Sequence, residues 1–222
     1  MSSATLSFTL RPASDWNDLI QAAGVRAASY GHHTPSLRSM LEDPDEVDLS
    51  PSTAVFLCHD KRTGEAVGTA RVQVTTRGPL LIDQCIDLPD DMTVHSRAEI
   101  TRMAARPGAD PLVKLALMKA GYLYCLATQV RWMVIGARNE ALIRQYRRLG
   151  FSDLYATDRM VPLSYTGGIL HRILRFDVTA AERTWLASRH PLYPFMIETV
   201  HADIQVVPQL RIEKQPSQKI AA

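Results

Sequence analysis

The sequence predicts an α/β protein in which helices flank a mixed β-sheet, and three observations support this fold class. Short segments rich in β-forming residues alternate with amphipathic helical segments along the chain. Residues 112–126 are apolar around most of a helix circumference, which is typical of a buried helix. Residues 131–137 form a continuous apolar run, which is typical of a central strand.

The first half of the chain predicts one helix and four strands. A first strand over residues 7–11 ends at Pro12, and an N-cap at Ser14 begins a helix that Gly31 ends. The other strands are predicted over residues 53–59 and 66–75, which form a hairpin, and over residues 80–87.

The second half predicts strands that alternate with helices. Asp110 and Pro111 have the composition of a helix start, and Asn139 caps a second helix that Gly150 ends. The strands are predicted over residues 97–105, 131–137, 153–163 and 169–178, and a short helix over residues 179–188.

Length and composition indicate one large domain. The chain has 222 residues, a formal net charge of +2 and a hydrophobic share of 46%, which is sufficient for a sizeable core. We expect this domain to cover residues 1–188. Residues 189–222 then form a partly extended C-terminal extension with a disordered end.

The same features exclude several classes of protein. No run of like charge indicates a nucleic-acid partner, and no apolar run approaches the ~20 residues that a membrane span needs. The N-terminus lacks the basic start and apolar core of a signal peptide, so we expect a cytoplasmic protein that is not an integral membrane protein. Cys58, Cys85 and Cys125 are far apart and predict neither a disulfide nor a metal site.

One arginine lies on an apolar helix face. Arg26 shares the face of Leu19, Ala23 and Tyr30. It is either buried with an acidic partner, because an unpaired buried charge is costly, or its stem packs while its head reaches water. The acidic run that contains Asp45 and Asp48 follows this helix, and a solvated loop is the simplest interpretation of that run.

The segments Glu99-Ile-Thr-Arg102 and Tyr146-Arg-Arg-Leu-Gly-Phe151, with the order of the elements, resemble the GNAT acyltransferase fold. Within that fold the chain is more similar to two groups, the acyl-homoserine-lactone synthases and the FeeM-type N-acyl amino acid synthases. Four features in chain order carry this closer resemblance: Arg26 with Tyr30, Asp45 with Asp48, Gly68 with Arg71, and Glu99 with Arg102. Residues 162–171 resemble the N-acyl amino acid synthases in particular.

The resemblance implies a mostly antiparallel sheet with a V-shaped cleft between two central strands. It also implies transfer of a long-chain acyl group to the amine of an amino acid. The donor is the acyl-phosphopantetheine of acyl carrier protein, with no tightly bound cofactor. By resemblance Glu99 and Arg102 are the catalytic residues, and the substrate-binding residues are Arg26, Tyr30, Asp45, Asp48, Arg71, Thr101, Met103 and His171.

The choice of donor depends on the loop Arg106-Pro-Gly-Ala-Asp-Pro-Leu. Acetyl-CoA enzymes of this fold have a glycine-rich loop here that holds the pyrophosphate. This chain has one glycine, and Asp110 carries a carboxylate that repels phosphate, so we expect poor CoA binding. A tryptophan of the lactone synthases is also missing after the first helix. The alternatives are an acetyl-CoA-dependent N-acetyltransferase and a non-catalytic protein that binds acyl ligands.

Three roles remain open from the sequence. Glu99 acts as a general base, directly or through water, or it is the ion-pair partner of Arg102. Residues three apart on a strand point to opposite faces, so these two share a site only across a bulge. The helix over residues 112–126 either flanks an acyl-chain tunnel or is core, and His171 either lines the cleft or is structural.

Overall fold

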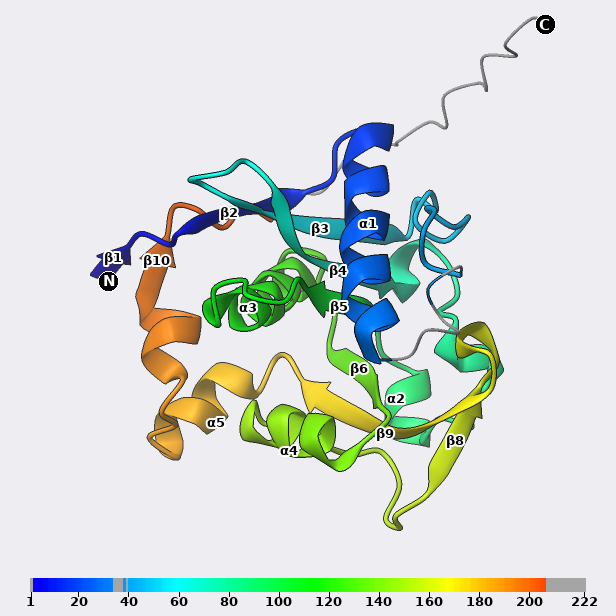
Figure 1. Cartoon of the computed structure of the whole chain (residues 1–222). Helices are drawn as coiled ribbons and strands as arrows, with labels where there is room; N and C mark the ends of the chain where they lie inside the picture. Colours follow the sequence, from blue (N-terminus) through cyan, green and yellow to red (C-terminus); the bar gives the residue numbers. More distant parts are fainter. Residues whose placement is uncertain (1, 34–37, 39, 207–222) are drawn as a thin grey trace, which may run out of the picture.

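The computed structural model describes residues 2–33, 38 and 40–206 (Figure 1). One sheet contains eight strands, with β8 paired to β9 and the others in the order β2-β3-β4-β5-β6-β9-β7. Only the β5–β6 pair of this sheet is parallel. The predicted mixed, mostly antiparallel sheet is therefore confirmed. The strands are β2 (Phe8–Pro12), β3 (Thr53–Asp60), β4 (Ala66–Val74), β5 (Arg97–Ala105), β6 (Trp132–Ala137), β7 (Ser152–Asp153), β8 (Met160–Leu163) and β9 (Ile169–Asp177).

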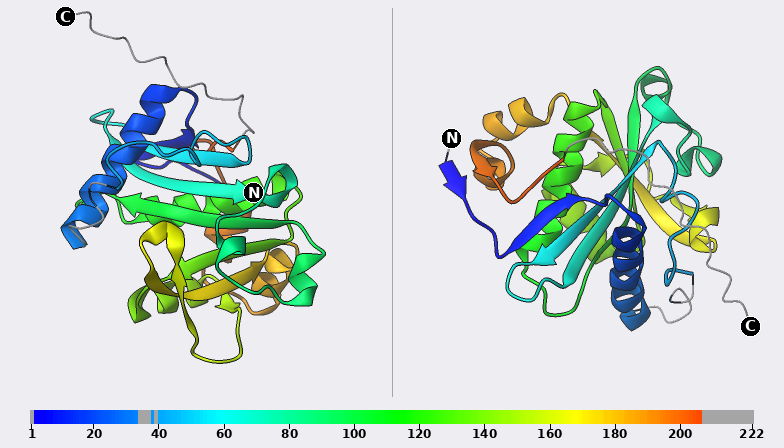
Figure 2. Two further views of the ribbon diagram at one scale, coloured as in Figure 1. Left: turned by 90° about the vertical axis from the view of Figure 1, so that its right-hand side faces the viewer. Right: turned by 90° about the horizontal axis from the view of Figure 1, so that it is seen from above.

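Helices cover both faces of this sheet (Figure 2). Helix α1 (Trp16–His33) packs on β3, β4 and β5 from one side. The short α2 (Asp90–Thr93) covers the same side farther along, through Met92. On the other side lie α3 (Leu112–Ala127), α4 (Glu140–Arg148) and α5 (Ala181–Ala187), which enclose the larger part of the core.

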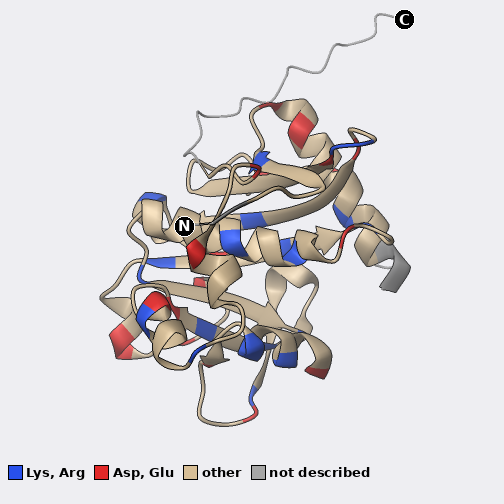
Figure 3. Ribbon diagram, turned by 90° about the vertical axis from the view of Figure 1, so that its left-hand side faces the viewer, with Lys and Arg blue, Asp and Glu red and all other residues tan. Residues whose placement is uncertain are grey.

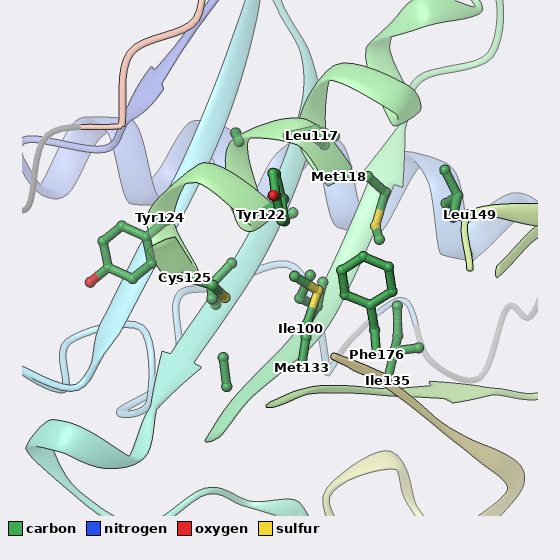
Figure 4. Packing of buried hydrophobic residues seen from close by; sticks show 14 of the residues in the cluster. Ile100, Leu117, Met118, Tyr122, Tyr124, Cys125, Met133, Ile135, Leu149 and Phe176 are labelled. Atoms are coloured by element: carbon green, nitrogen blue, oxygen red, sulfur yellow. The ribbon is translucent and has the colours of Figure 1, made fainter. Parts of the chain in front are cut away.

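Helix α3 is part of the core. Its buried side chains, among them Leu117 and Tyr122, lie with Ile100 of β5 and Met133 of β6 (Figure 4). Among the described residues, Lys114 is the one member of α3 that lines the large cavity of the molecule. The structure therefore places most of α3 in the core.

Two helix starts show how local hydrogen bonds set the boundaries. Helix α1 begins at Trp16, because Asp15 Oδ1 and not Ser14 accepts the Asp18 N–H, at 2.9 Å. The helix also continues past Gly31 to His33. The predicted cap at Asn139 is confirmed, since its side chain accepts the Leu142 N–H at 3.0 Å.

Two predicted strands are wrong in extent or in kind. Residues 153–163 are interrupted, with β7 and β8 separated by residues 154–159. Residues 80–87 contain the 3₁₀ helix η3 (Ile82–Gln84) in place of a strand. The Ile82 N–H donates to the Glu99 carboxylate at 3.1 Å, so it is not available to a strand partner.

The described part of the C-terminal segment returns to the N-terminus. A π-helical turn, η5 (Pro194–Glu198), leads into β10 (Thr199–His201), which pairs in parallel with β1 (Ser2–Ala4). The buried Lys119 ammonium of α3 donates to Phe195 O and Thr199 O, both at 2.7 Å, and to His201 Nδ1 at 3.0 Å. The predicted disordered end, residues 214–222, lies outside the described residues.

Across residues 2–33, 38 and 40–206, none of the helices combines the length and the apolarity that crossing a bilayer requires.

Candidate active site

A cleft opens where the two parallel strands separate. Strands β5 and β6 pair as far as Ile100 and Ile135, and beyond that point β5 follows β4 while β6 follows β9. A cavity of about 770 Å³ lies at this fork, with walls from α1, α4, β9 and the 3₁₀ helix η4 (Ser164–Thr166). This is the predicted V-shaped cleft.

A bulge in β5 shapes the wall of the cleft. Arg71 pairs with Thr101 and Thr69 pairs with Ala104, so Arg102 and Met103 together oppose one residue of β4. Arg102 adopts a left-handed backbone with φ 54°, a conformation that a non-glycine residue takes up only at a cost. Because of the bulge, Glu99 and Arg102 both line the cavity.

Arg26 is buried with an acidic partner. Its guanidinium makes a two-pronged ion pair with Asp48, at 2.6 and 2.9 Å, and both side chains are buried. Burial alone would raise the pKa of Asp48, but the charge of Arg26, its hydrogen bonds and the charge of Arg71 outweigh burial and lower it. The interpretation of this loop as solvated is therefore wrong for Asp48.

The charge network extends from this pair to the cleft. Arg71 Nη1 contacts Asp45 at 2.7 and 2.8 Å and Asp48 at 3.4 Å, and its Nε donates to Thr101 Oγ1 at 2.9 Å. Arg71 is fully buried, whereas the Asp45 side chain is 37% exposed. Residues that the sequence places on a helix, a loop and two strands thus form one network.

Arg102 is the member of the network with the weakest contacts. Its Nη2 lies 3.8 Å from Asp45 Oδ2 and 3.5 Å from the carbonyl oxygen of Tyr165. Burial, Arg71 and Arg26 lower its pKa. Three arginines and two aspartates leave the network with one excess positive charge, so an anionic group that enters the cleft would meet a guanidinium able to bind it.

Tyr30, Met103 and His171 all line the cavity. The Tyr30 hydroxyl donates to the Met103 carbonyl at 3.2 Å and so ties α1 to the bulge. His171 Nδ1 lies 2.8 Å from Ile169 O, and burial lowers the pKa of the ring, which favours the neutral form. His171 is thus both a lining residue and a partly satisfied histidine.

Glu99 is inaccessible although it lies against the cavity. It is 0% exposed, its Oε1 accepts from the Tyr165 hydroxyl at 2.5 Å, and its Oε2 accepts from Ile82 N–H. Burial raises the pKa of Glu99 to about 6. Tyr165 lies within residues 162–171, and the sequence alone assigns it no role; the one local signal is a hydroxyl-bearing ring shortly before two glycines.

The start of α3 is occupied by a carboxylate of the chain itself. Asp110 Oδ1 accepts the Leu112 N–H at 2.8 Å, and Asp110 Oδ2 accepts from the Ser7 hydroxyl at 2.5 Å. A phosphate at this helix end would compete with that carboxylate for the amide and be repelled by it. Along the ribbon on this side of the molecule, basic and acidic residues are interspersed (Figure 3).

The described residues contain no group of three or more His, Cys, Asp or Glu side chains that is placed to hold a metal ion. The polar groups that line the cleft include the guanidinium of Arg102, the hydroxyls of Tyr30 and Tyr165, the carboxylate of Glu99 and the imidazole of His171. They suit hydrogen bonding and proton transfer.

The raised pKa of Glu99 predicts a stability change with pH. A carboxyl whose pKa rises from 4.5 to about 6 on folding stabilises the fold below the unfolded value, and this contribution is lost as the pH rises through 6. The shift corresponds to about 2 kcal/mol. We therefore compare the unfolding free energy of Glu99→Gln with that of the wild type at two pH values. Relative to the wild type, the variant should be about 2 kcal/mol more stable at about pH 7.5 than it is at about pH 4.

Urea unfolding of both proteins at the two pH values measures this change. Any loss of stability from the glutamine that does not depend on pH is the same at both values and cancels when the two differences are subtracted. The exposed Glu182→Gln of α5 is the control and should show no such gain. Equal differences at both pH values would mean that Glu99 titrates normally.

Comparisons with known proteins agree on the fold. No family model and no curated protein sequence matches the chain. The structure of FeeM, an N-acyl amino acid synthase from uncultured soil microbes, is similar with a TM-score of 0.59 and 18% identity, and covers 85% of this chain and 98% of FeeM. BjaI, a CoA-dependent acyl-homoserine lactone synthase, has a TM-score of 0.56 and 17% identity over 90% and 96% of the two chains.

A putative acetyltransferase of the GNAT family from Desulfovibrio desulfuricans has a TM-score of 0.55 and 17% identity, over 77% of this chain and 99% of that one. The fold predicted from the sequence is confirmed: this chain has the GNAT fold. The similarity to FeeM and BjaI also agrees with the resemblance stated from the sequence motifs.

Proposed function

We propose that the protein is an N-acyltransferase that moves an acyl group, of long chain, from the thioester of acyl carrier protein to the amine of an amino acid. One observation carries the proposal. At the fork of β5 and β6, the weakly paired guanidinium of Arg102 and the hydrogen-bonded pair of Tyr165 and Glu99 face the same cavity.

The fork suits an amide-bearing thioester arm. Past Ile100 and Ile135 the two strands no longer pair with each other, so their backbone groups at this point can bond an extended chain such as pantetheine. Backbone N–H groups at the fork would also stabilise the oxyanion that forms when the amine attacks the thioester. The apolar lining from Ile135, Leu142 and Leu163 suits the acyl chain.

Arg102 supports an amino acid as acceptor. Its planar fork matches a carboxylate, and its contacts to Asp45 and to the Tyr165 carbonyl are both long. The excess positive charge of the network favours an anion at this position. An amine without a carboxylate would offer no anionic partner to the Arg102 guanidinium, which would keep only its two long contacts.

Asp110 supports a carrier-protein donor over free CoA. Its carboxylate caps α3 at the helix end where the CoA pyrophosphate binds in acetyl-CoA enzymes of this fold. BjaI, by contrast, is described as CoA-dependent, so overall similarity does not distinguish the two donors. The experiment below therefore compares the two acyl donors directly.

The test is a matrix of two donors and a panel of acceptors. Purified protein receives dodecanoyl and hexadecanoyl groups on acyl carrier protein or on CoA, with each of the common amino acids, and mass spectrometry measures N-acyl products. We expect product from the carrier-protein donor and a preference for each amino acid over its decarboxylated amine. Arg102→Gln should raise KM for the amino acid about 10- to 100-fold and remove that preference.

The exposed turn variant Arg62→Gln is the matched control and should behave like the wild type. Product from CoA alone would contradict the donor but not the acyl transfer. Equal use of an amino acid and its decarboxylated amine would contradict the role of Arg102. Absence of product from every combination would overturn the proposed function.

A further inference from the structure

Glu99 and Tyr165 both line the cavity, but they differ in accessibility. Glu99 is 0% exposed and both of its oxygens accept from protein donors. Tyr165 is partly exposed, and its hydroxyl donates to Glu99 Oε1. An amine bound in the cavity would therefore meet Tyr165, the accessible member of the pair, before the enclosed carboxylate.

We propose that Tyr165 is the catalytic residue that takes the proton from the substrate amine, and that Glu99 acts through it as a positioning residue and proton reservoir. This inference rests on the proposed function, because it assigns the proton path of that reaction. In this proposal Glu99 does not remove the amine proton directly, which was one of the roles that the sequence left open for it.

The proton steps balance. The substrate ammonium passes one proton to the Tyr165 oxygen as Tyr165 passes its own proton to Glu99. The neutral amine then attacks the thioester carbonyl, and its carbon–nitrogen bond forms as the carbon–sulfur bond breaks. The thiolate leaves with the second amine proton, and Glu99 returns its proton to water through Tyr165. The products are one amide, one thiol and one released proton.

The surroundings of the pair favour this direction of transfer. Burial raises the pKa of Tyr165, and the charge of Glu99 raises it further, so the tyrosine holds its proton in the resting state. Burial also raises the pKa of Glu99, to about 6, which lets Glu99 accept a proton more readily than an ordinary carboxylate. Above about pH 6, Glu99 is therefore ionised and able to accept a proton, while Tyr165 is protonated and able to donate one.

The titratable neighbours that shift the pKa values of the pair lie on β4 and in the segment that contains η3. Arg71 of β4 lowers the pKa of Glu99, and Asp83 of η3 raises it. On the Tyr165 side, Cys85 raises the pKa of the phenol and Arg71 lowers it. The pair is thus held between one cation and one anion, and its proton affinity is set locally.

Tyr165→Phe is the first variant, because it removes the hydroxyl and keeps the ring. With the carrier-protein donor and the amino acid turned over fastest in the panel, we expect kcat to fall about 10²- to 10⁴-fold while KM for the donor changes little. The wild-type rate should fall on the acid side as Glu99 becomes protonated near pH 6, and this limb should disappear in the variant. Tyr155→Phe, which loses a hydrogen bond to Asp87 O outside the cavity, is the control and should keep the wild-type rate and limb.

Two further measurements separate a relay from a packing effect. Glu99→Gln should lower kcat by a similar factor, and the double variant should be no slower than the poorer single variant, because the two residues act as one unit. Carbon-13 NMR of the glutamate carboxyls should show Glu99 titrating higher in Tyr165→Phe than in the wild type, since the Tyr165 hydrogen bond lowers its pKa. Glu99→Gln assigns the signal.

The outcomes distinguish the two proposals. An active wild type with Tyr165→Phe at the wild-type rate overturns the relay and leaves the acyl transfer standing. Additive losses in the double variant, or a Glu99 titration that ignores Tyr165→Phe, also overturn the relay. A wild type inactive with every donor and acceptor overturns both.

Discussion

Asp48→Asn is expected to lower the free energy of unfolding by about 3–5 kcal/mol, which is the cost of removing one partner from a buried ion pair. Asp48 accepts two hydrogen bonds from Arg26 and lies 3.4 Å from Arg71, and all three side chains are buried. An asparagine would leave the buried guanidinium of Arg26 without the anion it pairs with, while Arg71 would keep Asp45 alone. Chemical denaturation at neutral pH measures the loss.

Two controls sharpen this prediction. Glu42→Gln removes one partner of the exposed pair with Arg38 and should cost less than about 1 kcal/mol. The second control is pH. The folded-state pKa of Asp48 is lowered, so its stabilising contribution is present above the unfolded value of about 3.9 and is lost as the pH falls through the folded value. The gap between variant and wild type should therefore narrow in acid, and a gap that stays constant would contradict the assignment.

Lys119→Met is expected to cost about 2–4 kcal/mol, because it removes the donor that satisfies two partly buried carbonyls and one buried ring nitrogen. Those acceptors are Phe195 O, Thr199 O and His201 Nδ1, so the variant should also loosen the segment that contains η5 and β10. Limited proteolysis within residues 189–206 reports that loosening, and denaturation reports the free energy.

Lys114→Met is the matched control on the same helix. Lys114 is exposed, so its replacement should change the unfolding free energy by no more than about 0.5 kcal/mol. If Lys119→Met were equally mild, the ammonium would be satisfied by water and the hydrogen bonds to the C-terminal segment would contribute nothing.

Periodicity placed the core-facing residues well, and one of the predicted helix caps is confirmed. Arg26 points inward because helical spacing puts it on the face of Leu19 and Ala23, and Asn139 caps α4 because its side chain suits an N-cap. The strand Arg97–Ala105 begins and ends as predicted. Such features depend on neighbours within a few residues, which the sequence displays directly.

The remaining features depend on contacts between distant segments. The Ile82 N–H bonds to the Glu99 carboxylate instead of to a strand partner. Tyr165, which is 66 residues from Glu99 in the sequence, donates to the same carboxylate. Both require the relative placement of elements that the sequence does not state. The burial of Asp48 likewise follows from where its loop meets α1 and β4, whereas composition alone favours a solvated loop.

The bulge at Arg102 makes the length of β5 as important as its composition. Removing one residue there would restore a regular ladder in which Thr101 still pairs with Arg71 and Ala104 still pairs with Thr69, so the rest of the strand would keep its faces. The change would be confined to the cavity wall, where the two bulge residues Arg102 and Met103 would become one and the left-handed turn at Arg102 would be lost. A one-residue deletion at the bulge, which substitution scans leave untested, would therefore remove the placement of Arg102 beside Glu99 while the sheet around it keeps its register.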